Sequence, residues 1–408
     1  MMKKNIFGTA ALTAMAVALT ATMLLTACED DDPDMDAIIA EWEANIQLYK
    51  DIVFDYTALE EDEETFAEDD ADYVENTEFS RTVYISYEGD TAIVSGDYES
   101  LTWDIDGAHV TVTSTKKNVE YILSGATDNG SFKVYSDNKL KIELQGVSIT
   151  NPTGAAINDQ CGKSMYLVLT DSTESTLTDG STYNLVGNED QKGCVFSEGQ
   201  IIVSGKGTLN IYANYRHGLC SDDYIVMRPG HIVNIYCYAG SGMKSNDGID
   251  IRGGVHNIST TADGAKGLNT EGLLAVSGGR TTIITSGGTL INGTDTTSCA
   301  GVKGDMDIAI TAGELNAMCS GEGAKGINCN ANISITGGTI NVVAIGEKLY
   351  SSPKGIKADS TIVISGGYVY AFSAASDPID ADGGLTIEPG YTAINDSTTS
   401  TYLFEISY

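Results

Sequence analysis

The chain has 408 residues, of which 57 are Asp or Glu and 23 are Lys or Arg, so its formal net charge is −34. This excess of acids argues against a nucleic-acid partner, because phosphate backbones are bound by clustered Lys and Arg. Hydrophobic residues make up 42% of the sequence, which excludes global disorder. Cations, neutral sugars and basic proteins remain compatible partners.

The first 28 residues have the pattern of a bacterial lipoprotein signal peptide. Lys3 and Lys4 form a positive start, residues 6–24 are apolar, and small residues precede Cys28. This pattern predicts lipidation of Cys28, so that the lipid anchor is the only contact with a membrane. The acids in "CEDDD" resemble the surface-export tag of Bacteroidetes lipoproteins, which predicts an outer-membrane lipoprotein exposed on the cell. The alternative is a secretory signal with an incidental cysteine.

Residues 29–80 are predicted to form an acidic tether, because Lys50 is their only basic residue. One amphipathic helix is expected within the tether, since apolar side chains recur there at helical spacing. These are Ile38, Ile39, Trp42, Ile46, Tyr49, Ile52, Val53 and Tyr56. In residues 60–80 like charges dominate, which favours a solvated, extended spacer. Calcium buffering is the alternative role of these acids.

From Arg81 onward, short apolar-polar alternations broken at Gly, Asp and Asn predict strands. Residues 81–192 are expected to hold N-terminal strands and the first turns, residues 193–390 regular turns, and residues 391–408 a C-terminal cap. In the regular part a glycine opens each unit at intervals of about 25 residues, a length typical of solenoid repeats. These glycines are Gly193, Gly218, Gly242, Gly267, Gly301, Gly326 and Gly355. The predicted fold is all-β, a parallel β-helix in which each unit is one rung.

Pairs of apolar residues recur on both sides of each Gly-containing turn, such as Ile201/Val203 and Leu209/Ile211. Period-2 alternation sends both members of a pair to one face, which we assign to the interior. The pairs continue to Leu385/Ile387. One rung cannot bury such a face alone, whereas stacked rungs bury a continuous core.

Between the two inward residues after each turn lies one outward residue. This row is Asn210, Asn234, Asn257, Thr282, Asn316, Asn341 and Tyr370. Stacked strands lie about 4.8 Å apart, close to the rise of a sugar unit in an extended polysaccharide, so the row could bind successive sugars. The alternative is an amide ladder that satisfies itself and stabilises the solenoid. Further tyrosines offer sugar-stacking faces or are ordinary strand aromatics: Tyr212, Tyr215, Tyr236, Tyr238 and Tyr368.

A second row is acidic and lies near the rung corners. Calcium suits such a place, because it takes six to eight oxygen ligands from carboxylates, carbonyls and water. The alternative is a set of solvated Asx-turns. The predicted calcium ligands are Asp222, Asp223, Asp247, Asp250, Asp263 and Asp305.

A third row is basic: Lys244, Lys303 and Lys357 each stand two residues after an opening glycine. They either neutralise acids on neighbouring rungs or form a cationic strip that contacts the uronate carboxylates of a polysaccharide. A further basic set, Lys266, Lys325 and Lys354, lies just before the glycines.

Seven cysteines remain after Cys28, an odd number without a CxxC pair. This spacing predicts neither a disulfide framework nor a zinc site, and we expect the thiols to be buried as small apolar groups.

Several stretches together resemble one known family: "TVYISYEGDTAIVSG", "AAINDQCGKSMYLVLTDSTESTLTDG", "VFSEGQIIVSGKGTLNIYANYRHGLCSDD" and the run of rungs near "KGINCNANISITGGTINVVA". It is the β-helix carbohydrate-binding family of cellulolytic clostridia and gut Bacteroidetes. The resemblance implies a right-handed parallel β-helix similar to pectate lyases, bound calcium, and affinity for cellulose and polygalacturonate. It carries over Ser221, Asp222 and Asp223. Rungs of this family often open with the motif Asp-Gly-Ile, and several rungs of this chain lack the aspartate of that motif.

Three functions are compatible with these patterns. The first is a monomeric, non-catalytic binding protein that holds polysaccharide along the solenoid. The second is a pectate lyase, which needs calcium and a Lys or Arg base. The third is a structural adhesin. The candidate bases are Lys244, Lys266, Lys303, Lys357, Arg252 and Arg280.

Overall fold

The computed structural model describes residues 52–60, 70–187, 189–388, 392–395 and 402–407. Within these ranges the regular elements are strands apart from one short 3-10 turn, η1 (Val74–Asn76). No helix in this part of the chain is long and apolar enough to cross a membrane. The predominance of strands among the described residues confirms the predicted all-β class.

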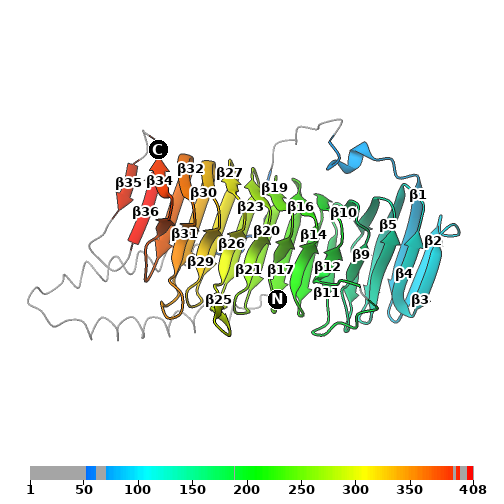
Figure 1. The fold of residues 1–408 in the computed structure, drawn as a ribbon. Helices are drawn as coiled ribbons and strands as arrows, with labels where there is room; N and C mark the ends of the chain where they lie inside the picture. Colours follow the sequence, from blue (N-terminus) through cyan, green and yellow to red (C-terminus); the bar gives the residue numbers. More distant parts are fainter. Residues whose placement is uncertain (1–51, 61–69, 188, 389–391, 396–401, 408) are drawn as a thin grey trace, which may run out of the picture. The chain divides into compact units, whose positions relative to one another are not determined.

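The strands stack as rungs along one axis, and each regular rung contributes three strands (Figure 1). We call the first strand position of a rung face B, the second face A1 and the third face A2. Face B is the 12-stranded sheet of β3 (Thr102–Asp106), β4 (Ala108–Ser114), β6 (Gly130–Ser136), β9 (Ile157–Gln160), β12 (Gly193–Ser197), β15 (His217–Ser221), β18 (Met243–Ser245), β21 (Lys266–Thr270), β26 (Ala300–Gly304), β29 (Lys325–Cys329), β31 (Lys354–Ala358) and β33 (Ile379–Ala381).

Faces A1 and A2 merge into one 22-stranded sheet, because β30 and β32 run through both faces. Face A1 contains β1 (Arg81–Glu88), β5 (Val119–Thr127), β7 (Leu140–Leu144), β10 (Met165–Leu169), β13 (Ile201–Gly205), β16 (Tyr224–Met227), β19 (Gly248–Ile251), β22 (Leu273–Val276), β27 (Ile308–Ile310), the first halves of β30 (Ile333–Ala344) and β32 (Thr361–Ser373), and β34 (Gly384–Ile387). Face A2 contains β8 (Ser148–Thr150), β11 (Glu174–Thr178), β14 (Thr208–Ala213), β17 (Ile232–Cys237), β20 (Val255–Thr260), β23 (Arg280–Thr285), β28 (Glu314–Cys319) and the second halves of β30 and β32.

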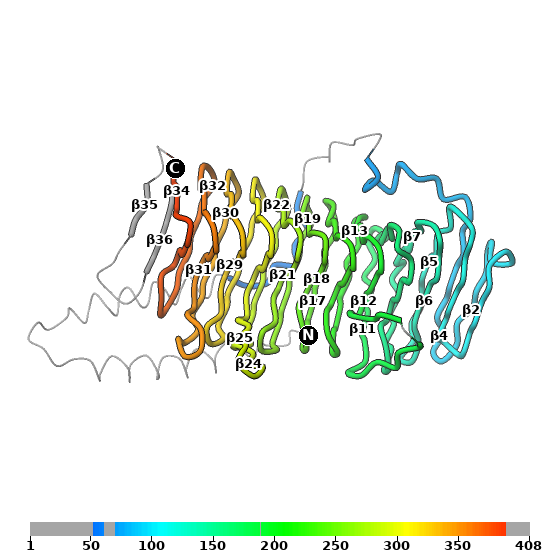
Figure 2. The backbone as a smooth tube through the Cα atoms, viewed as in Figure 1, coloured from blue at the N-terminus to red at the C-terminus, as the bar shows by residue number. Residues whose placement is uncertain are grey.

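Successive rungs pair in parallel on all three faces, and the tube in Figure 2 shows the repeated coils. Antiparallel pairs occur at the ends and in one insertion. At the first rungs β2 (Thr91–Gly96) pairs with β1, and β3 pairs with β4. Near the C-terminal end β36 (Tyr402–Ser407) pairs with β32 and with β35 (Thr392–Asn395). The insertion forms the hairpin of β24 (Leu290–Asn292) and β25 (Asp295–Thr297). The predicted parallel β-solenoid is thus confirmed.

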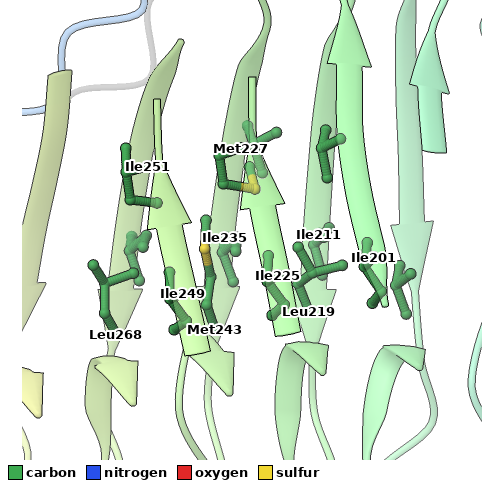
Figure 3. Packing of buried hydrophobic residues seen from close by; sticks show 14 of the residues in the cluster. Ile201, Ile211, Leu219, Ile225, Met227, Ile235, Met243, Ile249, Ile251 and Leu268 are labelled. Carbon is green, nitrogen blue, oxygen red and sulfur yellow. The ribbon is translucent and has the colours of Figure 1, made fainter. Parts of the chain in front are cut away.

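The core is the column of inward side chains that the sequence predicted. Figure 3 shows Ile201, Ile225 and Ile249 in one row of stacked residues, and Ile211 and Ile235 in another. The pairs are fully buried except the last, because Leu385 is 39% exposed on the terminal rung. The seven described cysteines are all buried and free, as predicted.

The opening glycines after Gly193 lie at face B, where they allow close approach of an apolar side chain from face A2 across the core. A Cβ on Gly267 would stand 2.3 Å from Cγ2 of Ile283, a distance that no real contact allows. Gly193 is the exception to the predicted alignment. It pairs with His217, so Cys194 occupies the place equivalent to Gly218.

The end of the predicted tether is part of the folded body. Most of the expected amphipathic helix lies outside the described residues, and residues 52–60 have no helical structure. Residues 70–79 were expected to be a solvated spacer, yet they pack on face A1. Phe79 and Val74 contact Tyr166 and its neighbours, and Glu75 forms an ion pair of 2.8 Å with Arg228. Burial of the two apolar side chains explains the difference from the charge-based prediction.

Candidate functional site

The predicted outward asparagines lie on face A2 in register and are hydrogen-bonded to one another. Asn234 donates to Asn210 over 2.8 Å, and Asn257 donates to Asn234 over 2.9 Å. A second segment joins Asn341 to Asn316 over 2.8 Å. Thr282 separates the two segments, because it occupies the equivalent place on the intervening rung.

This arrangement is the self-satisfying ladder, the alternative interpretation of the row. Asn234 and Asn316 are 3% and 8% exposed, so the row is not the open amide surface expected for sugar binding. Asn257 is 1% exposed and also donates to the Asp55 carbonyl of the N-terminal segment. Tyr370 is also only 4% exposed, which removes it from the predicted stacking surface. Because each ladder amide pairs with an equivalent amide 2.8 to 2.9 Å away, its first role is to hold the rungs in register.

A different polar column lies on face B and includes the three predicted lysines. The strand register aligns, rung by rung, the residues Lys244, Asn269, Lys303, Asn328 and Lys357. We call these five residues the Lys/Asn strip. All five are partly exposed, and adjacent members lie on neighbouring strands, about 4.8 Å apart.

Asn269 and Asn328 were missed by the sequence analysis, although a signal was present. Both stand two residues after an opening glycine, at the same place as the lysines. Asn269 makes one long hydrogen bond, of 3.4 Å, to Ser241. Among the residues that the structure describes, the Asn328 side chain has no hydrogen-bond partner. The strip therefore presents amide groups that are available to a ligand.

Acids border the strip and pair with its lysines. Lys244 contacts Glu271 and Lys303 contacts Asp305, at 2.8 and 2.7 Å. Lys357 contacts Asp359 and lies 3.7 Å from Asp382. Burial alone would lower the pKa of Lys357, but the hydrogen bond and attraction to these carboxylates outweigh it and raise the pKa. The lysines therefore pair with neighbouring acids, which agrees with the first of the two alternatives predicted for them.

The six acids predicted to bind calcium do not converge. Three have cationic partners: Asp222 pairs with Lys192, Asp250 with Arg252, and Asp305 with Lys303. Asp223 accepts hydrogen bonds from Gln200 and the Tyr224 amide, Asp263 accepts from the Gly288 amide, and Asp247 is exposed. Within the described ranges no three His, Cys, Asp or Glu side chains form a group that could hold a metal ion. These acids thus do not fit a shared calcium site, and calcium stays a prediction.

The remaining candidate bases are either buried or paired with acids. Lys266 is buried, and burial lowers its pKa. Arg252 and Arg280 form ion pairs with Asp72 and Asp55 of the N-terminal segment, at 2.6 and 3.1 Å.

The predicted tyrosines are grouped near face A2 and the loops that follow it. Tyr212 and Tyr236 are stacked, with ring centroids 5.0 Å apart. Tyr215 stacks on Tyr183 at 4.3 Å, and Tyr238 is half exposed. Tyr212 and Tyr236 lie in β14 and β17, whereas Tyr183, Tyr215 and Tyr238 follow β11, β14 and β17, where the chain turns from face A2 toward face B.

A parallel β-solenoid whose outer face carries repeated amides, amines and carboxylates has the features of an extended ligand-binding surface. A family model described as carbohydrate-binding domain-containing protein matches residues 106–351 and 323–400. The chain therefore belongs to this carbohydrate-binding-domain family.

Two individual proteins show more limited similarity. A carbohydrate-binding domain-containing protein of Acetivibrio thermocellus is 28% identical over 135 residues, which are 32% of this chain and 47% of the relative. The matched part of the chain thus spans about half the length of that relative. A solved polysaccharide lyase-like protein from C. thermocellum, a gadolinium derivative, has 21% identity and a TM-score of 0.42. That comparison covers 76% of this chain and 98% of the other.

Proposed function

We propose that the protein is a non-catalytic carbohydrate-binding protein and that the Lys/Asn strip of face B is its main contact surface. The observation that carries this proposal is the open, unpaired amide of Asn328 between Lys303 and Lys357, within a domain of a carbohydrate-binding family. An extended chain lying along the strip would meet one polar side chain on each rung.

The chemistry of the strip suits the hydroxyl groups of sugars. A hydroxyl both donates and accepts hydrogen bonds, and the strip with its border offers amide and amine donors beside amide and carboxylate acceptors. Its charge is close to balanced, because three lysines face Glu271, Asp305, Asp359 and Asp382. A balanced surface favours a neutral, cellulose-like polysaccharide over a strongly charged one.

We also propose that Cys28 anchors the protein to the outer membrane by a lipid, with the solenoid at the cell surface. Residues around Cys28 lie outside the described part of the chain, so this proposal rests on the signal-peptide pattern alone. Labelling with a radioactive fatty acid, followed by protease treatment of intact cells, tests both parts. An unlabelled protein or one protected from protease contradicts the anchor or the exposure, respectively.

The strip is tested by retention on insoluble cellulose and pectin. The double variant Asn269→Ala/Asn328→Ala removes two ligand hydrogen bonds, each worth about 1 kcal/mol, so affinity should fall by roughly thirtyfold. Asn292→Ala, at an exposed place in the β24–β25 hairpin, is the matched control and should bind normally. Equal retention of all three proteins contradicts the assignment. Ultraviolet absorbance with polygalacturonate detects an unsaturated product and would instead indicate a lyase.

A further inference from the structure

Residues 52–60, which we call the N-terminal strap, lie on face A2 across β17, β20 and β23. Ile52 is buried there, and Phe54 packs against Tyr236 with ring centroids 6.4 Å apart and an interplanar angle of 78°. Tyr56 shares a hydrogen bond of 3.2 Å with the hydroxyl of Tyr236. The strap therefore contacts Tyr236, one of the two stacked tyrosines, and Asn257 at the neighbouring end of the amide ladder.

The polar contacts of the strap centre on Asp55 and Thr57. The Asp55 carboxylate lies 3.1 Å from Nη2 of Arg280, and the same nitrogen donates to the Thr57 carbonyl over 2.9 Å. The Asp55 carbonyl accepts a hydrogen bond of 3.1 Å from Nδ2 of Asn257. Face A2 thus recognises a carboxylate, two carbonyl oxygens and an aromatic ring.

Two buried polar atoms of the residues that contact the strap are unsatisfied. Among the described residues, Oδ1 of Asn257 and Nε of Arg280 have no hydrogen-bond partner although both atoms are buried. Asn257 is 1% exposed, so water cannot readily replace the missing partner. Buried polar atoms are usually paired, so an unpaired acceptor and an unpaired donor on two residues that contact the strap indicate a surface that another ligand would satisfy better.

These two atoms and the Arg280–Asp55 pair define the chemistry of that ligand. A carboxylate can accept from both Nε and Nη2 of an arginine, whereas the strap uses Nη2 alone. A neighbouring hydroxyl could donate to Oδ1 of Asn257. A flat sugar face could pack on Tyr236 where Phe54 now lies, because amphipathic rings contact aromatic faces.

We propose that face A2 at Tyr236, Asn257 and Arg280 is a second saccharide subsite, selective for a carboxylated sugar, and that the N-terminal strap occupies it as a built-in competitor. This inference rests on the proposed carbohydrate-binding function but uses a different face and a different sugar charge. The strap leaves when the acidic sugar binds, and Asp55 marks the place of the sugar carboxylate.

The test uses the full chain and titrates trigalacturonate and cellotriose by calorimetry. The variant Phe54→Ala/Asp55→Ala weakens the strap and should bind trigalacturonate at least roughly tenfold more tightly than the unchanged protein. Adding Arg280→Gln to this variant should abolish the gain, whereas Glu314→Gln, at the equivalent place on the next rung, should not. Cellotriose binding should be the same in all four proteins.

Hydrogen exchange of the unchanged protein tests whether the strap moves. Saturating trigalacturonate should speed amide exchange in residues 52–60, whereas cellotriose should not. The inference is overturned if the weakened strap gives no gain in trigalacturonate affinity, or if bound trigalacturonate leaves exchange in the strap unchanged. Failure of the strip variants to lose cellulose retention would overturn the face B proposal instead, so the two outcomes are separate.

Discussion

Replacing Asn234 by Ala distinguishes the two roles considered for the amide row. Asn234 donates to Asn210 over 2.8 Å and accepts from Asn257 over 2.9 Å, and it is 3% exposed. The substitution removes both bonds and leaves a buried amide hydrogen of Asn257 without its acceptor. A net hydrogen bond is worth about 1 kcal/mol, and a buried unpaired group costs about 1–3 kcal/mol, so we expect a loss of about 2–4 kcal/mol.

Urea unfolding followed by circular dichroism measures this loss as a lower midpoint with an unchanged slope. Asn292→Ala, which lies on the exposed hairpin, should leave the midpoint unchanged. Retention of Asn234→Ala on cellulose below its unfolding midpoint should equal that of the unchanged protein. The reasoning is refuted if this variant loses retention but keeps its stability, because the amide would then contact the polysaccharide and not the next rung.

Three further predictions concern the core and its titratable groups. His231 and His256 are buried with Nε2 atoms 3.2 Å apart, and burial lowers both pKa values, that of His231 to about 3. The unfolded chain therefore binds more protons than the folded protein below pH ~6.5. The free energy of unfolding should fall as the pH drops, by about 1.4 kcal/mol per pH unit for each histidine. In a series of urea midpoints measured at different pH values, His256→Gln should reduce this slope. Burial lowers the pKa of Lys325 to about 8, so the folded state releases its proton first and stability should rise between pH 8 and ~10.4, a slope that should be absent in Lys325→Met. Gly267→Ala should destabilise the fold by about 1–3 kcal/mol through overpacking against the core, whereas Gly162→Ala, where a Cβ meets open space, should be neutral in the same assay.

The rung architecture was accessible from the sequence because it depends on two local properties. Alternating apolar residues determine which side chains face inward, and the repeated glycines mark where an apolar side chain of the core approaches the backbone. The register of Lys244 and Lys303 with the intervening rung followed from the same spacing. The predicted alignment of the rungs was wrong by one residue at Gly193, because Cys194 occupies the place of the opening glycine on that rung.

The packing of the N-terminal strap was not accessible in the same way. Ile52, Val53 and Tyr56 continue the helical spacing of the preceding residues, so the local pattern predicted the end of an amphipathic helix and no contact with the solenoid. The contacts that hold it join residues about two hundred positions apart, such as Asp55 and Arg280. From the sequence alone, Arg280 could equally bind a ligand, face solvent or form an ion pair. Only the folded structure shows that it pairs with Asp55.

A comparison of the amide ladder of face A2 with the Lys/Asn strip of face B explains why asparagine has different roles on the two faces. On face A2, Asn210, Asn234 and Asn257 stand on consecutive rungs, so each amide meets another that is both donor and acceptor. The three amides hydrogen-bond to one another, and among the described residues Oδ1 of Asn257 is left unpaired at the end of the column. On face B the asparagines alternate with lysines, which donate but cannot accept. The alternation prevents a continuous ladder, and the lysines turn to the bordering acids instead. An amide such as Asn328 is then left to a ligand, so alternation, not the presence of asparagine, is the feature that favours binding.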